Sequence, residues 1–496
     1  MDEVLSEKGY KNSRRPASSS RSASQAGRIV PTDRAFYLKY HFHNPYVIEK
    51  MSDSPLVIEK IVNGGYGLAR RDDGQIVLLR HVLPGETVTA RILTEKKGFA
   101  EAALSKVIKA SPHRISPPCP KYGACGGCDL QHCNSEQQLH IKKRIIADLL
   151  ERAPQSALQQ AVPLLADPIA SPLAFGYRQR IRLQIDEHRQ PGFRRYHSHQ
   201  CVPITECLLA RPELNNVLQQ LQGQPPFHKI LATTTELELL LNPSSSKAIC
   251  LFHLIRKPRP ANMKQAEALM ETLPLVEKIL FHGQDFLPCG PSSGNKDDGD
   301  NDELQFLLPP FPGHTDKSIS LALEAGGFCQ VNPEQNIQLI QTVLDFCQTD
   351  RQTTVLDLFC GMGNFSIPLA IQSASLLGIE GQGSAIRSAR INSKRAGLTN
   401  TLFEKNPIHE RCQTLVTEGR SFDCVVIDPP RQGVPGLARH LAALARKRLV
   451  YISCDPATLC WDLGELSCAG FAIIKLQPVD MFPQTHHIET VVLLEK

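Results

Sequence analysis

The sequence predicts an α/β protein with a C-terminal doubly wound sheet, an N-terminal β-barrel and an α+β region between them. Residues 54–113 contain short β-rich runs separated by glycine turns, a pattern typical of a small five-stranded barrel. Over residues 321–496, helical and strand patterns alternate, which indicates a doubly wound sheet. Residues 114–320 have a mixed pattern that begins with a cysteine-rich segment, so a central α+β region is expected there.

Composition sets the broad class of the protein. The chain has 496 residues, enough for about two to four domains. Its net charge of +5 permits a nucleic-acid partner without requiring one. We expect a cytoplasmic protein, because no apolar run is long enough to cross a membrane and no secretory signal is evident. The 16 cysteines should then stay reduced, which favours metal-binding or catalytic roles over disulfides.

Two segments have the composition of loops. Residues 1–53 include the Ser/Arg-rich stretch KNSRRPASSSRSASQAGR, which has too few apolar residues for a core and is predicted to be disordered. Residues 291–303 are polar and acidic, and are predicted to form a loop without a function.

Arginines alternate along one predicted strand of the central region, at Arg178, Arg180 and Arg182. Such a row is usually only a solvated face. The aromatic residues beside it favour an RNA-facing surface.

The stretch VLDLFCGMGNFSIPLA (355–370) predicts a buried strand, a glycine loop and a helix start. Gly361 and Gly363 allow a ligand to approach the backbone, although the dinucleotide fingerprint lacks its third glycine. Glu380 ends the next predicted strand at a spacing suited to ribose hydroxyls, and Asp428 ends a third strand. Three polar strand ends without a diphosphate cradle favour S-adenosylmethionine over NAD or ATP.

Cys454 follows the predicted strand 449–453, immediately before the turn at Asp455-Pro456. A free cysteine is most often a small buried hydrophobe. A nucleophile is the alternative, because open parallel sheets place their chemistry at strand exits.

Cys119, Cys125 and Cys128 have the spacing C-x5-C-x2-C, with Gly126-Gly127 between the last two. Thiolates at this spacing can surround one metal centre. An iron–sulfur cluster is favoured over zinc, because structural zinc sites prefer two C-x2-4-C pairs and only one such pair is present.

Several motifs together resemble the RNA uracil-5 methyltransferase family. DLFCGMGNFS, DPPRQG, YISCDPATL and MFPQTHHIE resemble its class I S-adenosylmethionine-dependent methyltransferase domain, which is Rossmann-like. Phe328, Gln330 and Asn332 match its F-x-Q-x-N element. CPKYGACGGCDLQH resembles the iron–sulfur segment of the members that act on 23S ribosomal RNA, and residues 54–113 resemble their OB-like TRAM barrel. The resemblance extends from residue 54 to the end of the chain.

The resemblance implies a set of functional residues. Cys454 would add to C6 of the uracil and Glu489 would remove the C5 proton. The two would be neighbours if the last strand is inserted antiparallel beside the strand that carries LVYIS, as in methyltransferases of this class. The implied S-adenosylmethionine contacts are Gln330, Phe359, Asn364, Glu380, Asn406 and Asp428.

The family pattern also completes the metal site. Alignment with the family pattern selects Cys207 rather than Cys201 as the fourth ligand of a 4Fe-4S cluster. Cys133 is a further candidate ligand near the motif. The cluster would have a structural or RNA-positioning role. The implied partner is 23S ribosomal RNA, and the protein is expected to be a monomer without membrane contact.

Other functions are less compatible with these residues. A radical S-adenosylmethionine enzyme would usually show C-x3-C-x2-C. The simpler tRNA uracil-5 methyltransferases of the family usually lack both the barrel and the cluster segment. A non-catalytic RNA-binding protein would not need both Cys454 and Glu489.

Overall fold

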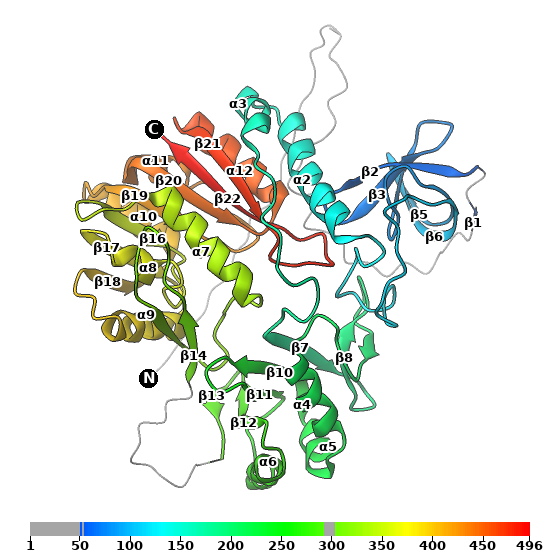
Figure 1. Ribbon diagram of the computed structural model, residues 1–496, viewed down its shortest axis with the longest axis horizontal. Helices are drawn as coiled ribbons and strands as arrows, with labels where there is room; N and C mark the ends of the chain where they lie inside the picture. Colours follow the sequence, from blue (N-terminus) through cyan, green and yellow to red (C-terminus); the bar gives the residue numbers. More distant parts are fainter. Residues whose placement is uncertain (1–49, 52–53, 292–302) are drawn as a thin grey trace, which may run out of the picture. The chain divides into compact units, whose positions relative to one another are not determined.

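The computed structural model describes residues 50–51, 54–291 and 303–496 (Figure 1). The predicted disordered extension and acidic loop therefore lie almost entirely outside the described residues. Among the described residues, no helix is both long and apolar enough to cross a membrane.

Strands β2 to β6 form the predicted five-stranded barrel, and the two-residue strand β1, which was not predicted, pairs with β5 as a sixth strand. Their order is β1-β5-β2-β3-β4-β6, and β5 also pairs with β6, which closes the sheet on itself. Alternate side chains such as Leu56, Ile58, Val77 and Leu79 fill the interior. The strands are β1 (Lys50–Met51), β2 (Leu56–Val62), β3 (Tyr66–Arg70), β4 (Ile76–Leu79), β5 (Thr87–Lys96) and β6 (Phe99–Lys109).

A mixed sheet and three helices that pack on it form the core of the central region. The strand order is β13-β12-β11-β10-β7-β8-β9, in which only β11 and β12 pair in parallel. Its strands are β7 (Arg180–Ile185), β8 (Pro191–Arg194), β9 (Cys201–Pro203), β10 (Thr234–Asn242), β11 (Lys247–Leu254), β12 (Val276–Gly283) and β13 (Phe286–Cys289). Its helices are α4 (Pro212–Gln222), α5 (Pro225–Leu231) and α6 (Pro260–Thr272).

The C-terminal sheet has the order β18-β17-β16-β19-β20-β22-β21. The first five strands run parallel, and β22 is antiparallel to both of its neighbours, so the predicted insertion of the last strand is confirmed (Figure 1). The strands are β16 (Thr354–Leu358), β17 (Ser375–Glu380), β18 (Thr401–Lys405), β19 (Phe422–Ile427), β20 (Ala445–Ser453), β21 (Ala472–Val479) and β22 (Glu489–Glu495).

Helices cover both faces of this sheet, which confirms the doubly wound fold. Successive residues of β16 alternate between the two cores: Val355 packs with α7, α8 and α9, and Leu356 packs with α10, α11 and α12. The helices are α7 (Pro333–Cys347), α8 (Ser366–Ala370), α9 (Gly383–Arg395), α10 (Ile408–Thr417), α11 (Ala438–Leu444) and α12 (Pro456–Cys468).

Segments from before residue 321 also pack on the C-terminal sheet. Ile146 and Leu150 of α2 (Ser135–Arg152) belong to the same hydrophobic core as Leu356. The hairpin of β14 (Glu303–Leu308) and β15 (Ile319–Glu324) belongs to the opposite core. Two short elements follow α2, namely α3 (Ser156–Gln160) and the 3-10 helix η1 (Val162–Leu164). Packing thus crosses residue 320, and the domain limits stay a prediction.

Candidate active site

The functional residues predicted on the C-terminal sheet gather at one edge. The carboxyl ends of β16, β17, β19 and β20 meet there because these strands are parallel, and β22 begins at the same edge because it is antiparallel. Phe359, Asp428 and Cys454 follow β16, β19 and β20, whereas Glu380 is the last residue of β17 and Glu489 is the first residue of β22.

The glycine loop after β16 is tightly wound. Phe359, Gly361 and Gly363 all have positive φ, at 63°, 55° and 90°. A Cβ at Gly363 would lie 2.9 Å from Cγ1 of Ile367, so both the conformation and the space require glycine there. Phe359 adopts a conformation that is rare for a bulky residue, a kind of strain that tends to occur at ligand sites.

Glu380 connects this loop to the next strand. Its carboxylate accepts hydrogen bonds from Gly361 N at 3.4 Å and from Gln382 N at 2.8 Å. The backbone N–H of Asn406 donates to Glu380 O at 3.1 Å, which places Asn406 beside Glu380. The side chain of Asn406 donates to Glu404 Oε2 at 3.3 Å. The structure therefore groups Glu380, Asn406 and the glycine loop.

A cavity of about 70 Å³ joins two segments that are separate in the sequence. Gln330 precedes α7 and Asn364 ends the glycine loop, and both line this cavity. Asn364 exchanges side-chain hydrogen bonds of 2.9 Å with Asn336 of α7, and Gln179 donates to Gln330 O at 2.9 Å. This arrangement allows Gln330 and Asn364 to contact one ligand.

Two aspartates at the edge have altered acidity. Burial raises the pKa of Asp428 to about 7. Burial, together with the charges of Asp428 and Glu380, raises the pKa of Asp357 to about 7, although Ser366 Oγ donates a hydrogen bond to its carboxylate. Asp357 was not predicted as a site residue. A carboxylate inside the otherwise apolar strand VLDL was the available signal.

Cys454 and Glu489 lie across the β20–β22 pair. Ser453 is opposite Thr490 in the ladder, and Cys454 and Glu489 are the next residue on each strand. Burial raises the pKa of Cys454 to about 12, and the neighbouring Glu489 contributes to this rise. Burial also raises the pKa of Glu489, which is 5% exposed, to about 8. Both groups therefore favour their neutral forms near pH 7.

Arg431 is the positive charge beside this pair. It lowers the pKa of both Cys454 and Glu489 against the effect of burial. Its Nη2 lies 3.5 Å from Nε2 of His487, two residues before Glu489. The DPPRQG motif was recognised in the sequence, but Arg431 within it was not assigned a role, because its contacts come from a segment 56 residues away.

The four predicted metal ligands are electrostatic neighbours. Cys125 interacts with Cys119 and Cys207, and Cys128 interacts with Cys125 and Cys207. In the part of the chain that the structure describes, however, no group of three or more His, Cys, Asp or Glu side chains is arranged to hold a metal ion. The iron–sulfur cluster stays a prediction.

Arg178, Arg180 and Arg182, at and just before the start of β7, were predicted to face RNA, and the structure gives them other partners. Arg178 is buried, and its positive charge lowers the pKa of Cys125, Cys128 and Cys207 against the effect of burial. Arg180 pairs with the buried Glu238 at 2.7 Å, and Arg182 pairs with Glu236 on the adjacent strand. The expectation of an RNA-facing row was wrong for Arg178 and Arg180, because their side chains are largely buried. The side chain of Arg182 is half exposed, and its contact with RNA stays a prediction.

Known proteins are similar to this chain over most of its length. Residues 313–496 match the family model described as tRNA (Uracil-5-)-methyltransferase. A protein of Shewanella halifaxensis named 23S rRNA (uracil(1939)-C(5))-methyltransferase RlmD is 32% identical, over 89% of this chain and 95% of that protein. The protein of the same name from Vibrio campbellii is 30% identical, over 88% of this chain and 95% of its own length.

The solved structure of Pyrococcus abyssi tRNA (uracil-54, C5)-methyltransferase, in complex with S-adenosyl-L-homocysteine, has a similar fold. The TM-score is 0.66 at 22% identity, and the match covers 89% of this chain and 99% of that one. At this identity the likeness is evidence for the fold alone. The identity with the curated relatives over nearly their whole length is evidence for the family: the chain belongs to the RNA uracil-5 methyltransferases, enzymes that use S-adenosylmethionine to methylate C5 of uracil in RNA.

Proposed function

We propose that this enzyme methylates C5 of a uridine in 23S ribosomal RNA through a covalent bond between Cys454 and the uracil. The observation that carries the proposal is the placement of a thiol and a buried carboxylic acid on neighbouring residues of the β20–β22 pair. The names of the curated relatives support the choice of RNA. The cysteine usage supports a reducing, cytoplasmic location.

S-adenosylmethionine would bind along the edge from the glycine loop to the end of β19, where it supplies the methyl group. Glu380 is suited to accept hydrogen bonds from ribose hydroxyls, because its carboxylate is held at a strand end by Gly361 and Gln382. Gln330 and Asn364 line a common cavity that can take the polar end of the ligand. The full proposed contact set is Gln330, Phe359, Asn364, Glu380, Asn406 and Asp428.

The nucleophile must first be ionised. The thiol of Cys454 has to lose its proton, which burial and the charge of Glu489 oppose and the charge of Arg431 favours. The sulfur then forms a bond to C6 of the uracil, and the electron pair of the C5–C6 double bond moves into an enolate. C5 becomes nucleophilic enough to form a bond to the methyl carbon of S-adenosylmethionine, whose bond from sulfur to methyl would break to leave S-adenosylhomocysteine.

Glu489 completes the reaction. Its carboxylate removes the C5 proton, the double bond re-forms, and the bond between C6 and sulfur breaks to release the Cys454 thiolate. A pKa of about 8 suits this step, because a general base works best when its pKa lies near the operating pH. Burial keeps water away from the base while the adduct exists.

Cys119, Cys125, Cys128 and Cys207 are proposed to hold an iron–sulfur cluster. The support is chemical: four thiols from two segments are electrostatic neighbours, and Arg178 provides positive charge beside them. The thiol of Cys201 instead donates to Gln184 O at 3.7 Å, which favours Cys207 as the fourth ligand. The cluster would have a structural role, since methyl transfer requires no electron transfer.

The substrate is tested by mapping 5-methyluridine in RNA from cells with and without the gene. The expected result is the loss of the modification from 23S ribosomal RNA, with tRNA unchanged. Restoring the gene with Cys454→Ala should not recover the modification. Loss from tRNA alone would favour the tRNA uracil-5 methyltransferase, the activity in the names of the family model and of the Pyrococcus structure.

A further inference from the structure

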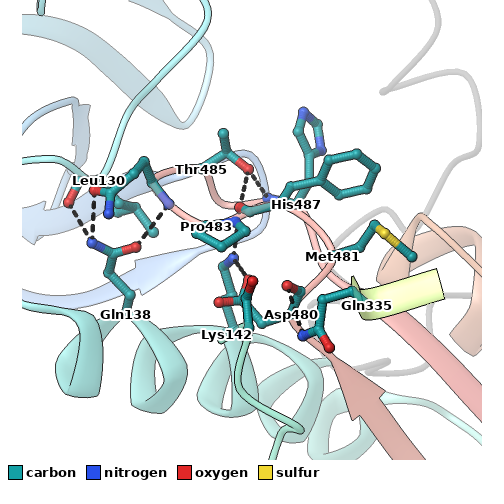
Figure 2. Close-up of polar contacts among 12 residues, drawn as sticks. Leu130, Gln138, Lys142, Gln335, Asp480, Met481, Pro483, Thr485 and His487 are labelled. Carbon is teal, nitrogen blue, oxygen red and sulfur yellow. Dashed lines mark hydrogen bonds and ion pairs between the residues drawn. The ribbon is translucent and has the colours of Figure 1, made fainter. Parts of the chain in front are cut away.

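The nine residues Asp480–Ile488, here called the base loop, connect β21 to β22 and end one residue before Glu489. Gln138 and Lys142 of α2 and Gln335 of α7 contact this loop (Figure 2). So does Leu130 of residues 119–133, here called the cysteine segment. Gln335 of α7 donates to Asp480 O at 3.0 Å, and Tyr177 donates to Pro483 O at 3.1 Å. The path of the chain into Glu489 is therefore set by residues that are distant in the sequence.

Gln484 is the strained residue of the base loop. Its φ is 69°, a left-handed conformation that costs free energy for any residue other than glycine, and its side chain is buried. Its N–H, its C=O and both polar atoms of its side chain have hydrogen-bond partners outside the loop. Those partners keep a conformation that the sequence alone disfavours.

Gln138 of α2 supplies the largest share of these contacts. Its Oε1 accepts from Gln484 N at 2.9 Å, and its Nε2 donates to Gln484 Oε1 at 3.0 Å. The same Nε2 also lies within hydrogen-bond distance of Leu130 O and Cys133 O, at 3.2 and 2.8 Å. One buried amide therefore connects the base loop to the end of the cysteine segment.

The hydrogen bonds between Gln138 and Gln484 are here called the anchor of the base loop. The cysteine segment and the next turn of α2 make further contacts with the loop. The N–H groups of Asp129 and Leu130, directly after Cys128, donate to Gln484 O at 3.1 and 3.0 Å. Lys142 lies four residues after Gln138 on the same face of α2. Its ammonium pairs with Asp480 and donates to Phe482 O at 3.0 Å (Figure 2).

We propose that Gln138 is a positioning residue for the proton-abstraction step, and that it acts by holding Gln484 and thereby the direction of Glu489. This rests on the role proposed above for Glu489. A base that is misplaced by about 1 Å can lose up to about 100-fold in rate, whereas Cys454 is held separately by β20 and α12. A change at Gln138 should therefore slow the step of Glu489 and spare the step of Cys454.

The test compares Gln138→Met with Gln137→Met, which makes the same change on the preceding, less buried residue of α2. Two substrates separate the steps: ordinary RNA requires removal of the C5 proton, and RNA with 5-fluorouridine at the target stops at the covalent adduct. With ordinary RNA, Gln138→Met should turn over about 10- to 100-fold more slowly and accumulate adduct. With fluorinated RNA, its rate of adduct formation should equal that of the wild type. Gln137→Met should match the wild type in both assays.

Equal loss in both assays would overturn the proposal, since it would mean general damage to the domain, and so would unchanged turnover. If Gln138→Met does not fold, Gln484→Met replaces it, because this variant removes only the side-chain hydrogen bonds of Gln484 and keeps those of its backbone. It should slow turnover of ordinary RNA by about 3- to 10-fold and leave adduct formation with fluorinated RNA unchanged. A wild-type enzyme that forms no adduct with fluorinated RNA would instead refute the proposed role of Cys454, which separates the two failures.

Discussion

Cys454 and the cysteines of the 119–207 region illustrate two ways of placing a thiol. Cys454 follows a central strand, and its position relative to Glu489 is determined by the ladder between β20 and β22. Cys119, Cys125 and Cys128 lie in turns that have only isolated β-bridges, and Cys207 comes from another segment. Both sites have an arginine beside the thiols, Arg431 in one and Arg178 in the other.

The difference lies in what determines the geometry. Strand register places side chains at fixed spacings before any ligand binds, and burial then adjusts their pKa values. Turn segments have no such ladder, so the distances between their thiols depend on what binds them. We expect the sheet edge to be formed without ligands, and the cysteine segment to be completed by the proposed iron–sulfur cluster.

The strongest test of the sheet edge is the pair Cys454→Ala and Glu489→Gln. Cys454→Ala should abolish methylation and form no adduct, because the variant lacks the thiol that adds to C6. Glu489→Gln should accumulate the adduct, because the C5 proton is not removed. Denaturing gels with labelled RNA would show the difference, with Cys468→Ala on the exposed end of α12 as a control that stays active. On such a gel the adduct appears as a band of enzyme shifted by the RNA bound to it. The mechanism is falsified if Cys454→Ala still forms this band.

The cysteine segment is tested by comparing Cys207→Ser with Cys201→Ser. Protein purified without oxygen should contain iron and sulfide, and Cys207→Ser should lose both while Cys201→Ser keeps them. Elemental analysis and the visible absorption spectrum report the result. A colourless wild-type protein with one zinc ion would support the zinc alternative, and the reverse pattern of the two variants would show that Cys201 is the ligand.

Glu380→Ala tests whether a preformed strand end binds S-adenosylmethionine. Loss of a charged acceptor for ligand hydroxyls should weaken binding by about 1–3 kcal/mol, roughly 5- to 150-fold. Calorimetry on the unmodified protein and the variant measures this, with the exposed Glu410→Ala of α10 as a control. Equal affinity in all three proteins would remove Glu380 from the site.

The smallest expected effect is a shift of the pH profile. Turnover should rise with pH through about 8, because Glu489 acts as a base only when deprotonated and Cys454 must also ionise. Arg431→Met removes a charge that lowers both pKa values, so the rise should move upward by about one pH unit or less. Arg439→Met on the exposed side of α11 should leave the profile unchanged. An unshifted profile for Arg431→Met would show that its charge does not reach the pair.

Much of the fold and site could be predicted from sequence because the signals are local. The barrel followed from short β-runs and glycine turns, and the doubly wound sheet from alternating patterns. The gathering of Glu380, Asp428 and Cys454 followed from their positions at strand ends. The neighbouring placement of Glu489 required the family resemblance, because no local pattern shows where a last strand is inserted.

Local patterns did not determine the partners of side chains. The sequence by itself predicted which residues end strands, which glycines wind the loop after β16 and which cysteines share a motif. Only the tertiary structure brought the charge of Arg178 near the thiols and the charge of Arg431 near Glu489. It also paired Gln138 with Gln484, which are 346 residues apart in the sequence. The physical reason is that periodicity and turn preferences act over a few residues, whereas burial and hydrogen-bond partners depend on which distant segments pack together.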